Sequence, residues 1–139
     1  MPSFIFNSAV RDEATGAIDY DTDNFKVMLL TAAAAPNKDT WAKRSDVTNE
    51  VVGAGYTAGG AAVVVEVGAV DTATDRVDIS LGGATWANAT ITARYAVYYK
   101  ARGGAATADE LVAVNDFGAD VASTAAAFAL AASTYRKQN

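Results

Sequence analysis

The side chains that carry out most enzyme chemistry near neutral pH are missing from this sequence. It holds 16 acidic and 11 basic residues, but no histidine and no cysteine. Histidine is the usual general base and the commonest metal ligand, and cysteine supplies thiol nucleophiles, thiolate ligands and disulfides. Ser-His-Asp and Cys-His catalysis are therefore impossible, and no S-x-x-K sequence supports a serine–lysine pair. We expect a protein that is not an enzyme.

The acidic residues offer two other kinds of chemistry. Asp19, Asp21 and Asp23 alternate as at the start of a calcium-binding loop. An EF-hand would continue with glycine at position 24 and glutamate at position 30, but the chain has Asn24 and Leu30 there. Paired carboxylates can also hydrolyse glycosides, although nothing in the sequence marks such a pair as buried. The acidic run therefore indicates a solvated turn, and we expect neither a metal nor a cofactor.

Two further patterns resemble sites for nucleotides or nucleic acid. Glycines cluster in residues 53–60, but neither G-x-x-x-x-G-K-[ST] nor a helix-opening G-x-G-x-x-G occurs, so tight turns explain the cluster. Three tyrosines lie between Arg94 and Lys100, a combination that could form a stacking platform for single-stranded nucleic acid. The formal net charge of -5 argues against nucleic acid as a partner. We expect these tyrosines mainly in the core.

The elements that would position these residues are mostly strands. Phe128, Leu130 and Ala132 fit one strand face near the end of the chain, although the alanines there favour a helix. Eight segments have the β-branched content or alternation of strands: 4–10, 25–31, 61–70, 76–81, 86–92, 93–101, 110–117 and 123–135. The pattern predicts an all-β, single-domain β-sandwich or jelly-roll-like fold of about eight short antiparallel strands over residues 1–139.

The segments between the predicted strands indicate turns and loops. Residues 11–24 predict a turn or a short hairpin, and residues 39–47 predict at most a short helix. Residues 51–60 form a glycine-hinged loop, and Gly82–Gly83 are expected to turn the chain.

Composition bears on size, location and assembly. At 139 residues the chain can bury one core, but much of its 51% hydrophobic content is alanine, which buries little area. Such a chain gains stability by burying further surface, so we expect a homo-oligomer, such as a trimer. The N-terminus lacks the features of a signal peptide, and no run of ~20 apolar residues predicts a membrane span.

Several segments of the sequence resemble those of a known protein family. They are FKVMLLT (25–31), PNKDTW (36–41), RSDVTNEV (44–51), GYTAGG (55–60), TWANATITAR (85–94), AVYYK (96–100) and DFGADVAST (116–124). In this order, over nearly the whole chain, they resemble a family of small structural proteins from the virions of tailed bacteriophages. The resemblance implies a β-fold virion protein, assembled in the cytoplasm of the bacterial host, with no catalytic residues to carry over.

Three hypotheses for the function follow. The first is a capsid decoration or cement protein that contacts the major capsid protein or another virion structural protein and stabilises the head shell through many repeated weak contacts. The second is a component of the tail, the collar or a fibre attachment. The third is a glycan-binding or glycan-degrading module, which predicts an exposed Trp41 or Trp86 beside a carboxylate pair.

Two segments are candidates for contacts with such a protein partner. The N-terminal strand carries Phe4, Ile5 and Phe6, and terminal strands can pair with a neighbouring sheet edge. The long loop over residues 37–56 carries Trp41, Arg44 and Tyr56. Packing within the chain is the alternative for both segments.

Overall fold

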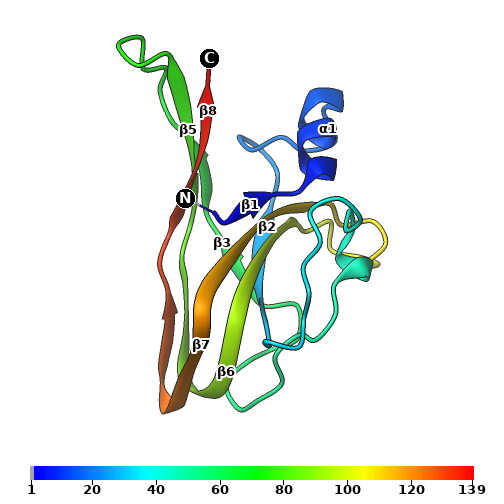
Figure 1. Ribbon diagram of the computed structural model, residues 1–139, viewed down its shortest axis with the longest axis vertical. Helices are drawn as coiled ribbons and strands as arrows, with labels where there is room; N and C mark the ends of the chain where they lie inside the picture. Colours follow the sequence, from blue (N-terminus) through cyan, green and yellow to red (C-terminus); the bar gives the residue numbers. More distant parts are fainter. Residues whose placement is uncertain (1) are drawn as a thin grey trace.

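Residues 2–139 are described by a computed structural model (Figure 1). Within this range the all-β class predicted from the sequence is confirmed, because eight strands form two antiparallel sheets in a sandwich-like arrangement. In chain order the elements are β1 (Phe4–Ile5), the helix α1 (Asn7–Thr15), β2 (Phe25–Leu30), the short 3-10 helix η1 (Arg44–Asp46), β3 (Ala61–Val63), β4 (Val65–Val67), β5 (Arg76–Leu81), β6 (Ala84–Lys100), β7 (Leu111–Leu130) and β8 (Ser133–Gln138).

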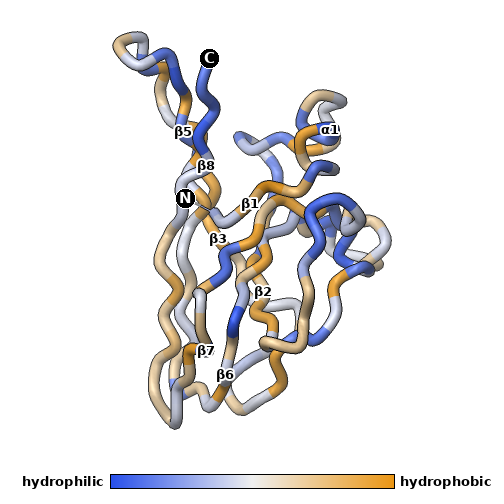
Figure 2. The backbone as a smooth tube through the Cα atoms, viewed as in Figure 1, coloured by the Kyte–Doolittle hydropathy of each residue, from blue (hydrophilic) through white to orange (hydrophobic). Residues whose placement is uncertain are grey.

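The larger sheet has the strand order β1-β7-β6-β2-β3, and the smaller sheet has the order β4-β5-β8. β2 pairs with β6 from Phe25↔Lys100 to Leu30↔Tyr95, and its other edge pairs with β3. Five of the six residues of β2 are buried, as its nearly continuous apolar run predicted. The core around it contains the fully buried side chains of Phe6, Leu29 and Tyr98. Figure 2 shows apolar residues along β1 and β2 and hydrophilic residues at the C-terminal end of β8.

Three short connections carry the chain from one sheet to the other. Val64 separates β3 from β4, Gly82–Gly83 separate β5 from β6, and residues 131–132 separate β7 from β8. The Gly82 N–H donates to the Val64 carbonyl at 2.8 Å, so neighbouring strands stay together across the boundary. The two sheets are therefore covalently continuous at three places.

Gly82–Gly83 do not turn the chain, and this prediction was wrong. They lead β5 directly into β6 at a point where strands lie very close. A Cβ on Gly82 would lie 2.5 Å from the Val64 carbonyl oxygen, and one on Gly83 would lie 2.3 Å from that of Leu130. Close approach of neighbouring backbones, rather than a turn, requires glycine here.

The β6–β7 hairpin bends sharply partway along its length. In Figure 1 both strands reverse their direction at the bottom of the view. Their register shifts between Trp86 and Ala89 and again between Ala89 and Ile91, and Asn88 and Ala125 have positive φ of 49° and 45°. Such irregularities increase the local bend of a strand pair. Beyond the bend, β6 and β7 continue into β5 and β8, the strands of the smaller sheet.

The N-terminal prediction was wrong in detail. The expected strand over residues 4–10 stops at Ile5, and a helix replaces both its second half and the start of the expected turn or hairpin over 11–24. Ala9 and Asp12 are buried and lie three residues apart, so one face of α1 packs on the body, and the N-cap residue Phe6 is fully buried beside it. Gly16 ends the helix with φ of 80°, and its N–H donates to the Glu13 carbonyl.

The remaining predictions differ from the structure mainly in their limits. Two predicted strands over 86–101 form the single strand β6, the segment over 61–70 divides into β3 and β4, and the strand predicted over 110–117 extends to Leu130. The helical turn expected over 39–47 is η1. The alanine-rich last segment is strand, as predicted.

Candidate functional site

The smaller sheet projects from the body as an arm, which we define as residues 65–81 and 133–139 (Figure 1). Side chains alternate between its two faces. Val67, Val77 and Ile79 line the face toward α1, whereas Asp78 and Arg136 pair on the other face. The face of the arm that points toward α1 is therefore apolar, and the opposite face is polar. Only part of the arm packs against the body.

The outer face of the arm is held by charge-assisted hydrogen bonds. The Arg136 guanidinium donates to both carboxylate oxygens of Asp78, at 2.8 and 3.0 Å. Arg76 lies 3.9 Å from the same carboxylate. The hydrogen bond from Arg136 holds the pKa of Asp78 below its ordinary value. The Arg136–Asp78 pair joins β8 to β5, whereas Arg76 and Asp78 lie in the same strand. All three side chains are partly exposed, so these pairs add little stability.

Exposed apolar side chains gather on the arm and at its base. Val64, Val67 and Val70 are 68%, 44% and 72% exposed, and they make up half of the large hydrophobic residues exposed in the described chain. We call these three residues the arm valines. Val67 ends β4, whereas Val64 lies in the connection between β3 and β4 and Val70 lies beyond β4. Exposed apolar side chains gathered in one part of a surface are typical of a contact site for a partner.

A cleft separates the arm from α1 and the loop that follows it. Its volume is about 550 Å³, and its lining includes Ile18, Tyr20, Val67, Val77 and Ile79. Acidic side chains at positions 13, 19 and 21 also line it. The cleft is therefore an apolar hollow with acidic groups around it.

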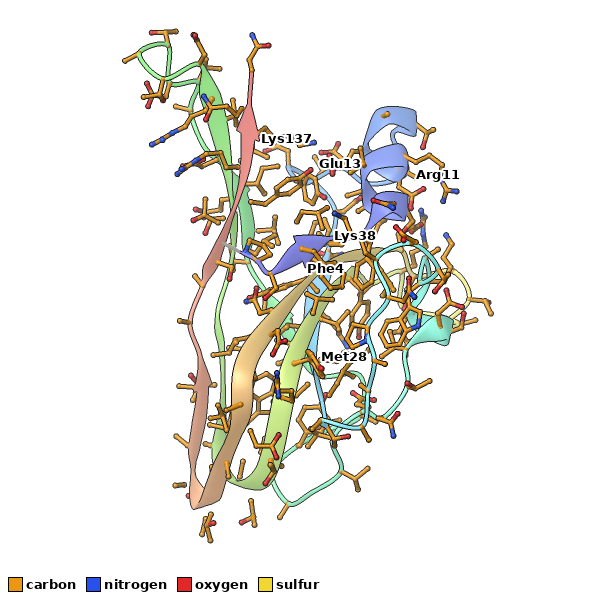
Figure 3. All side chains as sticks on the ribbon, in the orientation of Figure 1. Phe4, Arg11, Glu13, Met28, Lys38 and Lys137 are labelled. Carbon is orange, nitrogen blue, oxygen red and sulfur yellow. The ribbon has the colours of Figure 1, made fainter. Side chains whose placement is uncertain are left out.

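Glu13 ties the arm to the helix across this cleft. Its carboxylate accepts hydrogen bonds from Tyr20 Oη at 3.2 Å and from Tyr135 Oη at 3.0 Å, and it contacts Lys137 Nζ. Figure 3 labels Glu13 on α1 and Lys137 on β8, on facing sides of the cleft. Burial, together with the negative charge of Glu13, raises the pKa of Tyr20. The tyrosine hydroxyls therefore stay protonated and donate to Glu13.

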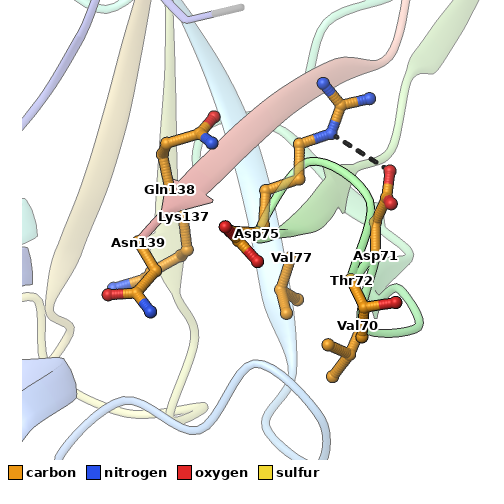
Figure 4. A pocket seen from close by; sticks show the side chains of 9 residues that line it. Val70, Asp71, Thr72, Asp75, Val77, Lys137, Gln138 and Asn139 are labelled. Atoms are coloured by element: carbon orange, nitrogen blue, oxygen red, sulfur yellow. Dashed lines mark ion pairs between the residues drawn. The ribbon is translucent and has the colours of Figure 1, made fainter.

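A second hollow, of about 380 Å³, lies at the tip of the arm (Figure 4). Asp71 organises it by accepting hydrogen bonds from the backbone N–H groups of Ala73 and Thr74 and from the Thr74 hydroxyl. These bonds, led by the one from the hydroxyl, lower the pKa of Asp71. Arg76 lies 3.8 Å from the same carboxylate. The acceptor atoms of Asp71 thus serve the turn itself.

The N-terminal candidates lie in one aromatic cluster. Phe4 and Ile5 are half-buried in β1, which pairs with Val114 and Ala113 of β7. The Phe6 side chain is fully buried, so in this fold it belongs to the core rather than to the surface. The Phe4 ring meets the Phe6 ring edge-on at 5.3 Å. β1 already completes an edge of the larger sheet of its own chain.

The loop candidates also have partners within the chain. Trp41 is half-buried and stacks on the Phe6 ring at 6.4 Å between ring centroids. Arg44 Nε donates to Asp109 at 2.7 Å. Tyr56 Oη donates to Glu50 at 2.6 Å and accepts the Leu29 N–H at 3.0 Å. The structure brings Trp41 to the N-terminal cluster but places Arg44 and Tyr56 in separate networks.

The other tryptophan does not form the exposed platform that the glycan hypothesis predicts. Trp86 is 6% exposed and packs between Tyr56 at 5.8 Å and Phe128 at 6.1 Å.

Asp109 and Glu110 are buried carboxylates that the sequence analysis did not single out. Both are 2% exposed. The Arg102 guanidinium donates hydrogen bonds to the Glu110 carboxylate from Nε at 2.8 Å and from Nη2 at 2.5 Å. Lys43 Nζ lies 3.7 Å from the same carboxylate. Burial alone would raise the pKa of Glu110, but these cations hold it below its ordinary value. The carboxylate therefore stays ionised as half of an ion pair and does not hold a proton for general acid catalysis.

Two further findings concern residues 2–139 as a group. They contain no set of three or more acidic side chains placed to hold a metal ion. None of their helices is long and apolar enough to cross a membrane.

Neither protein-family models, curated proteins nor solved structures gave a significant match to the chain.

The arm valines are functional candidates that the sequence analysis missed. Their spacing of three, in a segment read as a strand, was the available signal. A strand buries every second residue, so residues three apart cannot all point into one core.

Proposed function

We propose that this chain is a non-enzymatic structural protein of a tailed-phage particle, most simply a decoration protein of the capsid shell. The observation that carries the proposal is the projecting arm with Val67 and Val70 exposed on it and Val64 exposed at its base. An isolated domain gains nothing from apolar side chains held in water, whereas a docked one buries them. The arm is the docking element, and the bent sandwich is the rigid body that holds it.

The charge distribution supports a protein partner with a basic surface. All basic residues of the described chain except Lys26 and Lys38 form ion pairs with its own carboxylates. Several exposed carboxylates have no such ion pair: Asp19, Asp21, Asp39, Asp46, Glu66, Asp75 and Asp120. Complementary charge on the partner would steer association and would make it sensitive to salt.

The resemblance of the sequence to small virion proteins gives the proposal its biological setting. In that setting the partner is the major capsid protein or another structural protein of the particle. Repetition over a lattice, or a homo-oligomer such as a trimer, would multiply weak arm contacts into firm attachment. A tail, collar or fibre-attachment position would use the same arm in fewer copies.

The test begins with purified particles of a tailed phage that encodes the chain. Quantitative mass spectrometry and reconstruction of the particle should find the chain in hundreds of copies on the shell. About six to twelve copies would place it at the collar or tail instead. Its absence from purified particles would overturn the proposal.

The docking element is tested by variants added back to particles that lack the chain. Val67→Asp combined with Val70→Asp should weaken binding at least about tenfold, because it places charges on the docking surface. Val52→Asp is the matched control, since Val52 is 95% exposed but lies outside the arm. Equal binding by the arm variant and the control would remove the arm from the interface.

A further inference from the structure

Lys26 is a cation left without a carboxylate partner in a half-buried position. It lies in β2, where its cross-strand neighbours are Tyr99 on β6 and Ala62 on β3. Lys38, the other basic residue without an ion pair, is exposed in a loop beside the start of α1 (Figure 3). A lysine can lay its aliphatic stem along neighbouring side chains while its ammonium group stays in water and can bind an anion. Lys26, held between two strands, is therefore a better candidate for ligand binding than Lys38.

Lys26 lines a hollow of about 410 Å³ together with Arg44. The Arg44 guanidinium lies 5.4 Å above the centroid of the Tyr99 ring, which orients it. Asn24 and the glycines at 103 and 104 complete much of the rim. A Cβ on either of these glycines would meet nothing within 4 Å, so the rim is open on that side.

The charges that line the hollow leave one positive charge in excess. Asp109 is the single carboxylate among its lining residues, against the two cations. Both oxygens of Asp109 are already used: one accepts from Arg44 Nε at 2.7 Å and the other from the Arg102 backbone N–H at 2.9 Å. Burial raises the pKa of Tyr99 to about 12, so its hydroxyl adds no negative charge near neutral pH.

We infer that the hollow between Lys26 and Arg44 is a binding site for a carboxylate group. A single negative charge would balance the excess positive charge, and a planar carboxylate can take hydrogen bonds from an ammonium and a guanidinium together. A doubly charged phosphate would instead leave an excess negative charge in an already acidic protein. The inference is independent of the role in a phage particle.

The test is a titration of the whole chain, followed by amide NMR spectra. Acetate replaces chloride at constant ionic strength, and the amide signals of Gly59, Gly103 and Gly104 report on the hollow. We expect saturable shifts, weakened about fivefold or more in Lys26→Gln. Lys26→Arg, which keeps the charge, should retain binding, and Lys38→Gln, the matched control, should bind like the unaltered chain.

A second probe identifies the source of the carboxylate. N-acetylglutamate amide carries only a side-chain carboxylate. Tighter binding of this probe than of acetate would indicate an acidic side chain of a protein, and equal binding would indicate a free small carboxylate. Shifts that do not saturate, that occur equally with chloride, or that persist in a folded Lys26→Gln variant would overturn the inference.

Discussion

The buried carboxylates Asp109 and Glu110 are both paired with cations of their own chain. Glu110 is the clearest example, because it is almost fully buried and yet fully paired with Arg102. Removing one partner of such a pair leaves a charge in a poorly solvated place, which is more costly than the pair was favourable. The ion pairs around residues 101–110 therefore fix the end of the β6–β7 hairpin against the loop that contains Lys43 and Arg44.

Buried tyrosines give the chain a predictable alkaline limit. Burial raises the pKa of Tyr98 and that of Tyr99 to about 12. In the unfolded chain a tyrosine ionises near pH 10. The stability that they contribute is therefore complete below about pH 10 and is lost as the pH rises toward 12, by about 1.4 kcal/mol per pH unit for each. Urea unfolding at a series of pH values should follow this decline.

Tyr98→Phe tests the assignment of that decline. The variant loses the hydrogen bond from Tyr98 Oη to the Gly82 carbonyl, so at pH 8 it should be about 1 kcal/mol less stable. Its alkaline decline should nevertheless be shallower, because one titrating group has been removed. A slope identical to that of the unaltered chain between pH 10 and 12 would show that Tyr98 does not hold its proton as expected.

At the scale of a single element, the bend of the β6–β7 hairpin predicts how a substitution at Ala125 changes stability. Ala125 has φ of 45°, a conformation that costs an alanine about 1 kcal/mol and a glycine almost nothing. Ala125→Gly should therefore raise the free energy of unfolding by about 0.5 kcal/mol, despite the greater backbone freedom of glycine in the unfolded chain. Denaturant unfolding measures the change.

Ala122→Gly is the matched control for the bend. Ala122 lies in the same strand and pairs regularly with Thr92. Glycine should weaken the strand there by roughly 0.5–1 kcal/mol. Destabilisation of similar size in both variants would mean that the bend does not depend on a left-handed residue at position 125.

The strands were largely predictable from sequence because alternation and β-branched content are local. The helix was missed because Phe6 and Ala9 look like strand residues until the body against which they pack is known. The pairing partners of Gly82 and Gly83 lie far along the chain, so close approach was indistinguishable from a turn. The same reason hid the surroundings of Lys26, whereas the ion pair of Glu110 with Arg102, eight residues apart, was hidden because the sequence does not show that Glu110 is buried. Among the proposed contact residues, the burial of Phe6 could not be distinguished from the half-burial of Phe4, because the two phenylalanines have the same local sequence character.

At the scale of the whole molecule, strand continuity couples the arm to the body. β3 passes into β4, β5 into β6 and β7 into β8, each across only one or two residues. The base of the arm also shares buried side chains with the body, such as Ile79 and Leu81. Tyr135 adds a hydrogen bond to Glu13 on α1. The arm therefore cannot lose its pairing at the base without disturbing the larger sheet.

This coupling predicts one cooperative unfolding transition, with local opening confined to the exposed tip of the arm. Fluorescence from Trp41 and Trp86 in the body and far-ultraviolet circular dichroism should give coincident denaturation curves. In hydrogen exchange, the amides of residues 79–81 should open only with the global transition, because they lie where the two sheets join. Amides at the tip, over residues 69–74, should exchange much faster, since every side chain there is at least partly exposed. A separate early transition in calorimetry that removed protection from residues 79–81 alone would mean that the arm folds independently. It would then lack the rigidity that docking through Val67 and Val70 requires.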